Sequence, residues 1–303
     1  MPTPRRLLFP LVALAASALA LGGCAATSAD PAADGVTRVV ASTNVYGDLA
    51  ATIAGDHAEV TSVIENGDQD PHQFEANPRV QLSLAAADLV IENGGGYDDF
   101  IDTMLAAADN PKATVLNAVT LSGHNATADG FNEHVFYDYP TMSRLVTAIT
   151  KALSEVDPEN AQAFEANAKK LQSGLTELLE REATIASEHG GAGVIITEPV
   201  PLYALERSGL INETPPAFSE AIEEDSDVPA ALLQKVLDTI SSGRVAAVVY
   251  NAQTGGPQTD AILAAAKSAN VPAVPVTETL PNGEHYVEWQ RAVLTAINQA
   301  LQE

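Results

Sequence analysis

The sequence predicts an α/β protein with two lobes, each a parallel sheet flanked by helices, joined by a long rigid helix. In both halves, short apolar segments of strand character alternate with helical segments, which is typical of parallel sheets covered by helices. A helical run of about thirty residues separates the halves. Residues 36–303 are too many for one ordinary domain but suit two lobes, and 46% apolar residues suffice for their cores.

The first half contains four predicted strands and three predicted helices. The apolar character of the strands places them at residues 38–42, 58–64, 88–92 and 114–117. Helices are expected at 45–54, 77–87 and 97–108. Asn77-Pro78 is a good start for the second of these, because Asn caps a helix and Pro is tolerated in its first turn. We therefore assign residues 36–140 to an N-terminal lobe.

The middle of the chain, residues 141–190, is predicted to connect the lobes. No strand pattern occurs there, and from Pro158 to Glu188 the only Gly or Pro after the first residue is Gly174. Apolar residues recur at helical spacing at positions 164, 168, 171, 175, 178 and 179. A helix of this length would extend about 45 Å and act as a stiff connector.

The second half, residues 191–303, repeats the alternation without repeating the sequence. Strands are expected at 193–196, 245–250 and 273–276, and helices at 202–208, 228–242, 257–268 and 284–301. This pattern predicts a C-terminal α/β lobe of the same architecture as the first.

The amino terminus predicts export. Arg5 and Arg6 precede an apolar run from Leu7 to Leu21, which has the charge and length of a secretory signal and is too short for a confident transmembrane span. The single cysteine, Cys24, follows Gly22-Gly23, and this placement resembles a bacterial lipoprotein signal in which the cysteine is lipidated. We therefore expect a signal peptide at 1–23 and a lipid-anchored tether at 24–35, where the residues are small and polar.

The charge balance argues against some classes of ligand. The chain has a net charge of −25, and removal of residues 1–23 takes away Arg5 and Arg6 but no acidic residue. Such a surface does not favour nucleic acid, whose phosphates need cationic partners, and it is compatible with attracting cations. We expect no nucleic-acid partner.

Two histidines occur in similar acidic contexts that follow strand-like segments. They are His72, in Asp70-Pro71-His72-Gln73-Phe74-Glu75, and His134, in Glu133-His134-Val135-Phe136-Tyr137-Asp138. Ligands of open α/β sheets bind where strands end and helices begin, and neutral imidazole is a good ligand for transition metals. The other four histidines, His57, His124, His189 and His285, are expected at the surface, although the loop of His124 could lie near the cleft.

Two glutamates occupy the equivalent positions in the second half. Glu198 and Glu278 each follow a predicted strand directly, although a carboxylate at a helix start would also be stabilised by the helix dipole. Two imidazoles and two carboxylates could together enclose one divalent ion such as Mn²⁺, Zn²⁺ or Fe²⁺. Asn251 could hydrogen-bond one of these ligands, or it could cap the following turn.

These motifs, in this order, resemble those of the metal-binding lipoproteins of bacterial ABC importers for manganese and zinc, the cluster A-I solute-binding proteins. The resemblance extends from the signal to the last helix and includes Thr197-Glu198-Pro199 with Tyr203 and Gly209, and Thr277-Glu278-Thr279-Leu280. It implies that the metal ligands are His72, His134, Glu198 and Glu278. It also implies capture of one divalent ion for an ABC permease by a protein held outside the bacterial cell membrane by its lipid, and we expect a monomer.

The sequence departs from the family at several positions. Glu133 replaces the usual Pro before the second histidine, and Glu278 stands where Asp is common. The third position is Glu198 rather than the histidine of many zinc-specific members, and the segment 121–133 contains only His124 instead of a His-rich loop. These features resemble the manganese members, and oxygen donors suit a harder ion, although affinity alone would still favour Zn²⁺ over Mn²⁺.

A binding protein without enzymatic activity is therefore the leading interpretation. One alternative is a binding protein for a metal chelate of the siderophore type, but such a cleft needs aromatic or Arg side chains, and only 5% of the residues are aromatic. Another is a two-lobed metallohydrolase. Four protein ligands leave little room for the water that a catalytic zinc site keeps, and no sequence motif of a metallopeptidase or serine hydrolase occurs. An additional adhesin role stays open.

Overall fold

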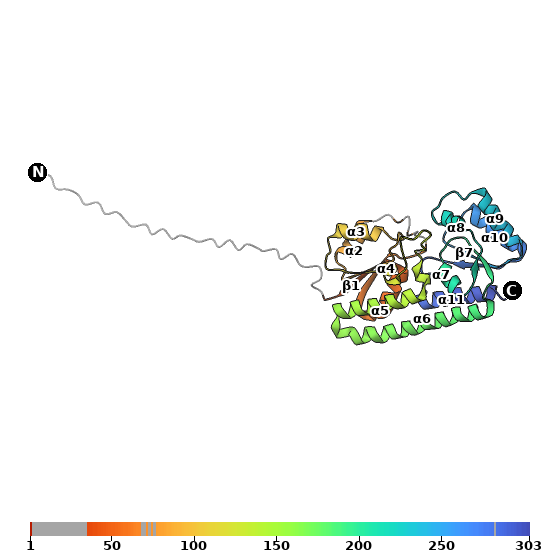
Figure 1. The fold of residues 1–303 in the computed structure, drawn as a ribbon. Coiled ribbons are helices and arrows are strands. Elements are labelled where there is room, and N and C mark those ends of the chain that lie inside the picture. The colour runs from red at the N-terminus through yellow and green to blue at the C-terminus, as the bar shows by residue number, and fades with distance from the viewer. Residues whose placement is uncertain (2–34, 68–70, 72–73, 75–76, 282) are drawn as a thin grey trace. The chain divides into compact units, whose positions relative to one another are not determined.

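The computed structural model describes residues 1, 35–67, 71, 74, 77–281 and 283–303 (Figure 1). Residues 35–303 form one compact unit. Among the described residues, none of the helices combines the length and apolar character needed to span a bilayer. The predicted signal peptide, Cys24 and most of the tether lie outside the described residues.

The first lobe is built on a four-stranded parallel sheet in the order β2-β1-β3-β4. Its strands are β1 (Thr37–Thr43), β2 (Ala58–Ile64), β3 (Leu89–Glu92) and β4 (Thr114–Asn117). The connecting helices are α1 (Asn44–Ala54), α2 (Pro78–Ala85) and α3 (Phe100–Ala108), and α4 (Ala118–Ser122) follows β4. The Asn77 side chain accepts hydrogen bonds from the backbone of Arg79 and Val80, so the predicted cap is confirmed.

Two long helices lie along the base of the molecule, one beneath the first lobe and the longer one beneath both lobes (Figure 1). They are α5 (Tyr139–Val156) and the 29-residue α6 (Ala161–His189), separated by the short 3₁₀ turn η3 (Pro158–Asn160). The predicted long helix is confirmed, except that its first turn is 3₁₀. Asp157 stabilises this 3₁₀ turn, because its carboxylate accepts hydrogen bonds from the backbone and side chain of Asn160.

The second lobe contains another parallel sheet, in the order β6-β5-β7-β8. Its strands are β5 (Gly193–Ile196), β6 (Ile211–Asn212), β7 (Val245–Asn251) and β8 (Ala273–Val276). The helices are α7 (Leu202–Arg207), α8 (Pro216–Glu223), α9 (Ala230–Ser241), α10 (Pro257–Ala269) and α11 (Tyr286–Ala300). Sequence reasoning did not predict β6, α8, α4 or the separate helix α5. The first three are too short for their periodicity to be detected.

One apolar core runs through both lobes. The same cluster contains Ile91 of the first sheet, Val249 of the second, and buried residues of α5, α6 and α11 such as Ile149, Leu175 and Leu294. Two smaller clusters lie on the outer faces of the sheets, one in each lobe. Helix α6 packs on α1 of the first lobe and on α7 and α11 of the second, so it holds the two lobes together through a common core.

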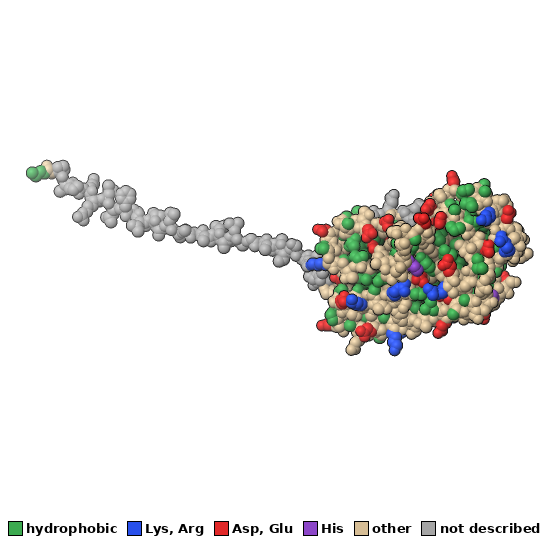
Figure 2. All heavy atoms as spheres, in the orientation of Figure 1, with side chains coloured by type: hydrophobic (Ala, Val, Ile, Leu, Met, Phe, Trp, Pro, Cys, Tyr) green, Lys and Arg blue, Asp and Glu red, His purple; other side chains and the backbone are tan. Residues whose placement is uncertain are grey.

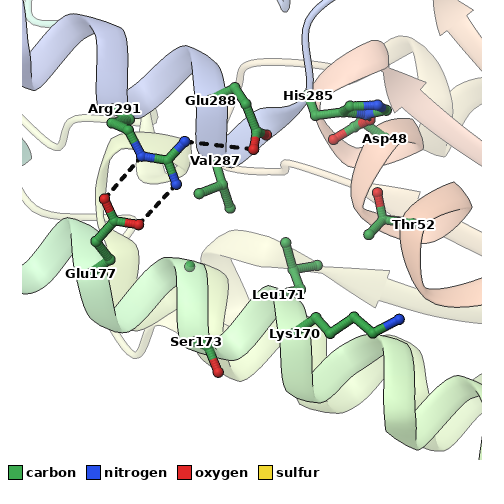
Figure 3. Close-up of a pocket in the computed structure, with 11 residues that line it drawn as sticks. Asp48, Thr52, Lys170, Leu171, Ser173, Glu177, His285, Val287, Glu288 and Arg291 are labelled. Atoms are coloured by element: carbon green, nitrogen blue, oxygen red, sulfur yellow. Dashed lines mark hydrogen bonds and ion pairs between the residues drawn. The ribbon is translucent and has the colours of Figure 1, made fainter.

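The contact between α6 and α11 is close and is reinforced by charge. A Cβ atom on Gly174 would lie 2.8 Å from Val287 Cγ1, so only glycine allows this approach. One turn further, Arg291 Nε and Nη2 donate to the two Glu177 carboxylate oxygens at 2.9 and 2.8 Å (Figure 3). Beside this pair lies a cavity of 620 Å³ between α1, α6 and α11, with Leu171 and Val287 among its lining residues.

The surface is acidic over both lobes. On the face in Figure 2, Asp and Glu side chains are spread widely, whereas Lys and Arg side chains are fewer. This distribution matches the net charge of −25 and provides an electrostatic field that attracts cations.

One acidic side chain lies in the core beneath the second lobe. Glu182 of α6 is fully buried, and burial raises its pKa to about 9, although Arg207 Nε lies 3.6 Å away and opposes the shift. The carboxyl is therefore protonated at neutral pH in the folded chain, whereas it ionises near pH 4.5 in the unfolded chain. The stability contributed by protonated Glu182 is complete below pH 4.5 and is lost as the pH rises toward 9.

We predict that Glu182→Gln raises the melting temperature at pH 8 and changes it little at pH 4, because the amide stays neutral at both pH values. Thermal unfolding followed by circular dichroism at both pH values measures this effect. Glu180→Gln, an exposed change on the same helix, is the matched control. An equal effect of Glu182→Gln at the two pH values would contradict the assignment of a protonated carboxyl.

Candidate metal site

His134 is fully buried and its imidazole is held by a neighbour in its own loop. The side chain oxygen of Asn132 accepts hydrogen bonds from the His134 backbone nitrogen, at 3.1 Å, and from Nδ1 of the ring, at 2.8 Å. Since an amide oxygen can only accept, Nδ1 carries a proton and Nε2 is the nitrogen available to a metal.

Asn132 also links the His134 loop to the second lobe. Its side chain nitrogen donates to the Pro199 carbonyl at 3.0 Å, directly after Glu198, and its own carbonyl accepts from the Tyr203 hydroxyl at 2.7 Å. On the first lobe, the Asn93 side chain donates to the Glu133 carbonyl at 3.0 Å. The imidazole is thus positioned from both lobes at once.

Aromatic rings enclose His134 on its apolar side. Tyr97 and Phe136 are both buried, and their ring centroids lie 5.7 and 5.6 Å from the imidazole centroid in edge-to-face arrangements. Tyr97 follows three glycines with positive φ, at positions 94 to 96, so the chain turns sharply there to bring the ring to the site. These rings keep water from one side of the site and lower its local dielectric.

The two predicted carboxylate ligands come together at the ends of parallel strands in the second lobe. Glu198 follows β5 and Glu278 follows β8, and both are at least 95% buried. Asn251, at the end of the intervening β7, donates through its side chain nitrogen to Glu198 Oε2 at 2.5 Å and Glu278 Oε1 at 2.7 Å. Asn251 therefore joins the two glutamates.

The loop after β7 fixes these glutamates further. The Gln253 side chain oxygen accepts from the backbone nitrogens of Glu278 and Thr279 at 2.6 and 3.1 Å, and its nitrogen donates to the Gly67 carbonyl of the first lobe at 2.8 Å. The Thr254 hydroxyl donates to Glu198 Oε1. Sequence reasoning identified neither residue, since nothing in the local pattern distinguishes them from ordinary loop residues.

The carboxylates perturb each other and the imidazole. Burial and the nearby Glu223 carboxylate raise the pKa of Glu198 to about 7, against the hydrogen bonds from Thr254 and Asn251. Burial lowers the pKa of His134, but Glu223 and Glu278 outweigh it and hold that pKa well above its usual value. Both pKa values are raised, as expected where negative charge accumulates.

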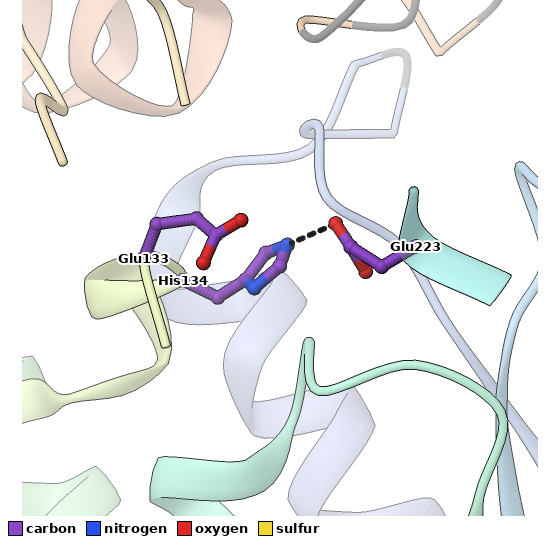
Figure 4. A group of neighbouring side chains, drawn as sticks. All are labelled: Glu133, His134 and Glu223. Carbon is purple, nitrogen blue, oxygen red and sulfur yellow. Dashed lines mark ion pairs between the residues drawn. The ribbon is translucent and has the colours of Figure 1, made fainter. Parts of the chain in front are cut away.

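The described part of the site places donor atoms close together. His134 Nε2 lies 3.7 Å from Glu278 Oε2 and 3.3 Å from Glu223 Oε1. Glu133, His134 and Glu223 form a group whose ligand atoms lie within 4.8 Å of one another (Figure 4). Glu223 was not predicted from the sequence, because it ends a helix far from any strand exit. Glu133 was noted only as a departure from the family pattern.

His72 lies outside the described residues, but the residues on either side are partly described. Pro71 is buried, and Phe74 packs against Phe100 of α3 with ring centroids 4.7 Å apart. Of the remaining histidines, His57, His124 and His285 are exposed and His189 is half-buried. His124 stacks on Tyr203 with centroids 4.9 Å apart and lies 3.4 Å from Asp138, so it belongs to the contact between the lobes.

Residues 39–300 match the family described as "Zinc-uptake complex component A periplasmic". The chain belongs to this family. The predicted resemblance to metal-binding solute-binding proteins of ABC importers is thereby confirmed, and with it the general function of extracytoplasmic metal capture for uptake. The family is one of solute-binding proteins rather than enzymes.

The sequence identity to individual relatives is low. The chain is 25% identical over 272 residues to the "Manganese-binding lipoprotein MntA" of Bacillus subtilis (strain 168), covering 85% of this chain and 84% of that protein. It is 28% identical over 183 residues to the "Manganese ABC transporter substrate-binding lipoprotein PsaA" of Streptococcus pneumoniae serotype 4, covering 55% and 57%.

Solved structures confirm the fold. The "Crystal structure of ZnuA" superimposes with a TM-score of 0.72 at 20% identity, over 88% of this chain and 99% of that one. The structure of FpvC from Pseudomonas aeruginosa with Mn²⁺ superimposes with a TM-score of 0.70 at 21% identity, over 88% and 98%. The predicted fold of two helix-flanked parallel sheets joined by a long helix is confirmed.

We predict that Asn132→Ala weakens divalent metal binding by about 10- to 100-fold, the usual cost of losing a group that orients a ligand. Asn132→Asp should lose less, because it keeps the acceptor for His134 Nδ1. Titration calorimetry on metal-free protein measures both, with Asn125→Ala on the exposed part of the same loop as the control. Unchanged affinity in Asn132→Ala would show that the imidazole does not need this bond.

Proposed function

We propose that this protein captures one divalent transition metal ion, with Mn²⁺ preferred, through His72, His134, Glu198 and Glu278, and delivers it to a membrane permease. The observation that carries the ligand assignment is the convergence of His134 and Glu278 at 3.7 Å, with Asn251 joining Glu278 to Glu198. His72 is included because its motif matches the family and because Gly67, five residues earlier, is bonded to the Gln253 loop of the second lobe.

The donor set supports the choice of ion. Two imidazoles and two carboxylates offer more oxygen than the zinc-specific members with a third histidine, and harder ions prefer oxygen. The named relatives MntA and PsaA are described as manganese proteins. Since Zn²⁺ binds most sites of this kind more tightly than Mn²⁺, selection in the cell then depends on coordination geometry and on metal supply.

The amino-terminal motif supports a location at the outer face of the cell membrane. We propose that Cys24 carries a lipid and that residues 24–35 tether a monomeric, metal-binding body to the outer face of the cell membrane. The short apolar run and the position of the cysteine support this proposal. Anchoring keeps the captured ion near the permease at a high local concentration.

We predict that Mn²⁺ raises the melting temperature of the wild type, since an ion that binds only the folded state adds about 2.7 kcal/mol at one hundred times its dissociation constant. His72→Ala and His134→Ala should lose most of this gain, whereas His57→Ala and His189→Ala should keep it. Differential scanning calorimetry with Mn²⁺, Zn²⁺ and Fe²⁺ tests the proposal. The absence of a shift with all three ions would favour an organic chelate as the ligand.

We predict that Cys24→Ala moves the protein from the membrane fraction to the soluble extracytoplasmic fraction while leaving metal affinity unchanged. Fractionation of expressing bacteria and immunoblotting measure the distribution. Retention of the Cys24→Ala protein in the membrane at wild-type level would show that another feature anchors it.

A further inference from the structure

An additional carboxylate enters the metal site from the second lobe. Glu223 is the last residue of α8, which packs on the outer core cluster of that lobe through the fully buried Phe218. The Glu223 side chain is only 9% exposed, and its Oε1 lies 3.3 Å from His134 Nε2 (Figure 4). The carboxylate therefore points inward at the same ring nitrogen that Glu278 faces.

The distances fit donors that share one ion. Two atoms bound to a metal at about 2.1 Å lie about 3.0 Å apart at a right angle and about 3.4 Å apart at the tetrahedral angle. From His134 Nε2, Glu223 Oε1 is 3.3 Å away and Glu278 Oε2 is 3.7 Å away. The distance to Glu223 Oε1 lies within this range, and Glu278 Oε2 is slightly further from the same ring nitrogen.

Glu223 also lies beside an open hollow. A cavity of 290 Å³ is lined by Glu223, Asp225, Gln253 and Thr254, among others. At about 30 Å³ per water molecule, it has room for an ion with its full shell of about six waters. Gln253 and Thr254 are the residues that bond Glu278 and Glu198, so the hollow adjoins the buried ligands.

We propose that Glu223 is a further ligand of the transported ion, placed between this hollow and the buried ligands, and that it shifts selectivity toward Mn²⁺. The proposal rests on the proposed function. Glu223 adds a third carboxylate to the described donors His134, Glu198 and Glu278. Zn²⁺ is satisfied by four donors in a tetrahedron, whereas Mn²⁺ accepts six mainly oxygen donors.

The test compares three variants of the full chain in metal-free form. Glu223→Gln and Glu223→Ala remove the carboxylate, and Glu224→Gln makes the same charge change at the exposed neighbouring residue. Competition titrations give Mn²⁺ and Zn²⁺ affinities, and the visible absorption of bound Co²⁺ reports coordination number, because four-coordinate Co²⁺ absorbs more strongly than five- or six-coordinate Co²⁺. Melting temperatures of the metal-free variants verify that each is folded.

For Glu223→Gln we expect Mn²⁺ affinity to fall by at least about tenfold, a typical loss for a disturbed ligand shell, with a smaller loss for Zn²⁺. Bound Co²⁺ should absorb more strongly in Glu223→Ala than in the wild type, and Glu224→Gln should match the wild type in both assays. Wild-type Mn²⁺ affinity in Glu223→Gln, tighter binding, or an unchanged Co²⁺ spectrum in Glu223→Ala would overturn the proposal.

The measurements distinguish failure of the proposed function from failure of the Glu223 assignment. If the wild type binds no divalent ion, the proposed function itself is wrong and the role of Glu223 falls with it. If the wild type binds and His134→Ala does not, while Glu223→Gln behaves like Glu224→Gln, then the metal site stands and only the assignment of Glu223 is overturned.

Discussion

The shared apolar core beneath the two lobes is the constraint on which the site depends. Residues of both sheets pack in one cluster with α5, α6 and α11, so the ends of strands from different lobes keep fixed positions relative to each other. Hydrogen bonds from Asn132 and Gln253 then extend this rigid arrangement to the loops that carry the proposed ligands. His134, Glu198 and Glu278 are thus held in place by hydrogen bonds without an ion, which lowers the entropic cost of binding one.

Several carboxylates are buried close together in this site, and neighbouring polar groups stabilise them. Burial and repulsion disfavour their ionised forms, as the raised pKa of Glu198 shows. Asn251 offsets part of this cost by donating to both Glu198 and Glu278, and His134 supplies the nearest positive charge. A divalent cation would neutralise the same carboxylates more completely. The unfavourable electrostatic energy of the metal-free site therefore favours ion binding.

The sequence predicted those features that depend on local pattern. Glu198 and Glu278 were recognisable because they follow apolar strands, and parallel strands bring their carboxyl ends to one edge of the sheet. Asn132 and Glu223 were not recognisable, because their contacts with His134 depend on how a long loop and the short helix α8 pack against other segments. The other strands and the long helix α6 were predicted within a few residues, whereas α4, β6 and α8 are too short for a clear pattern and α5 was not separated from α6.

The proposed ligands lie far apart along the chain, and this separation has a consequence for biogenesis. His134 meets Glu278 only when the second sheet has formed and α11 has docked on α6, since Glu278 lies between β8 and α11. Contacts between segments so distant in sequence form late in folding. A chain that is still unfolded during export therefore lacks the complete ion site, and it becomes a competitor for scarce metal only after its fold is complete.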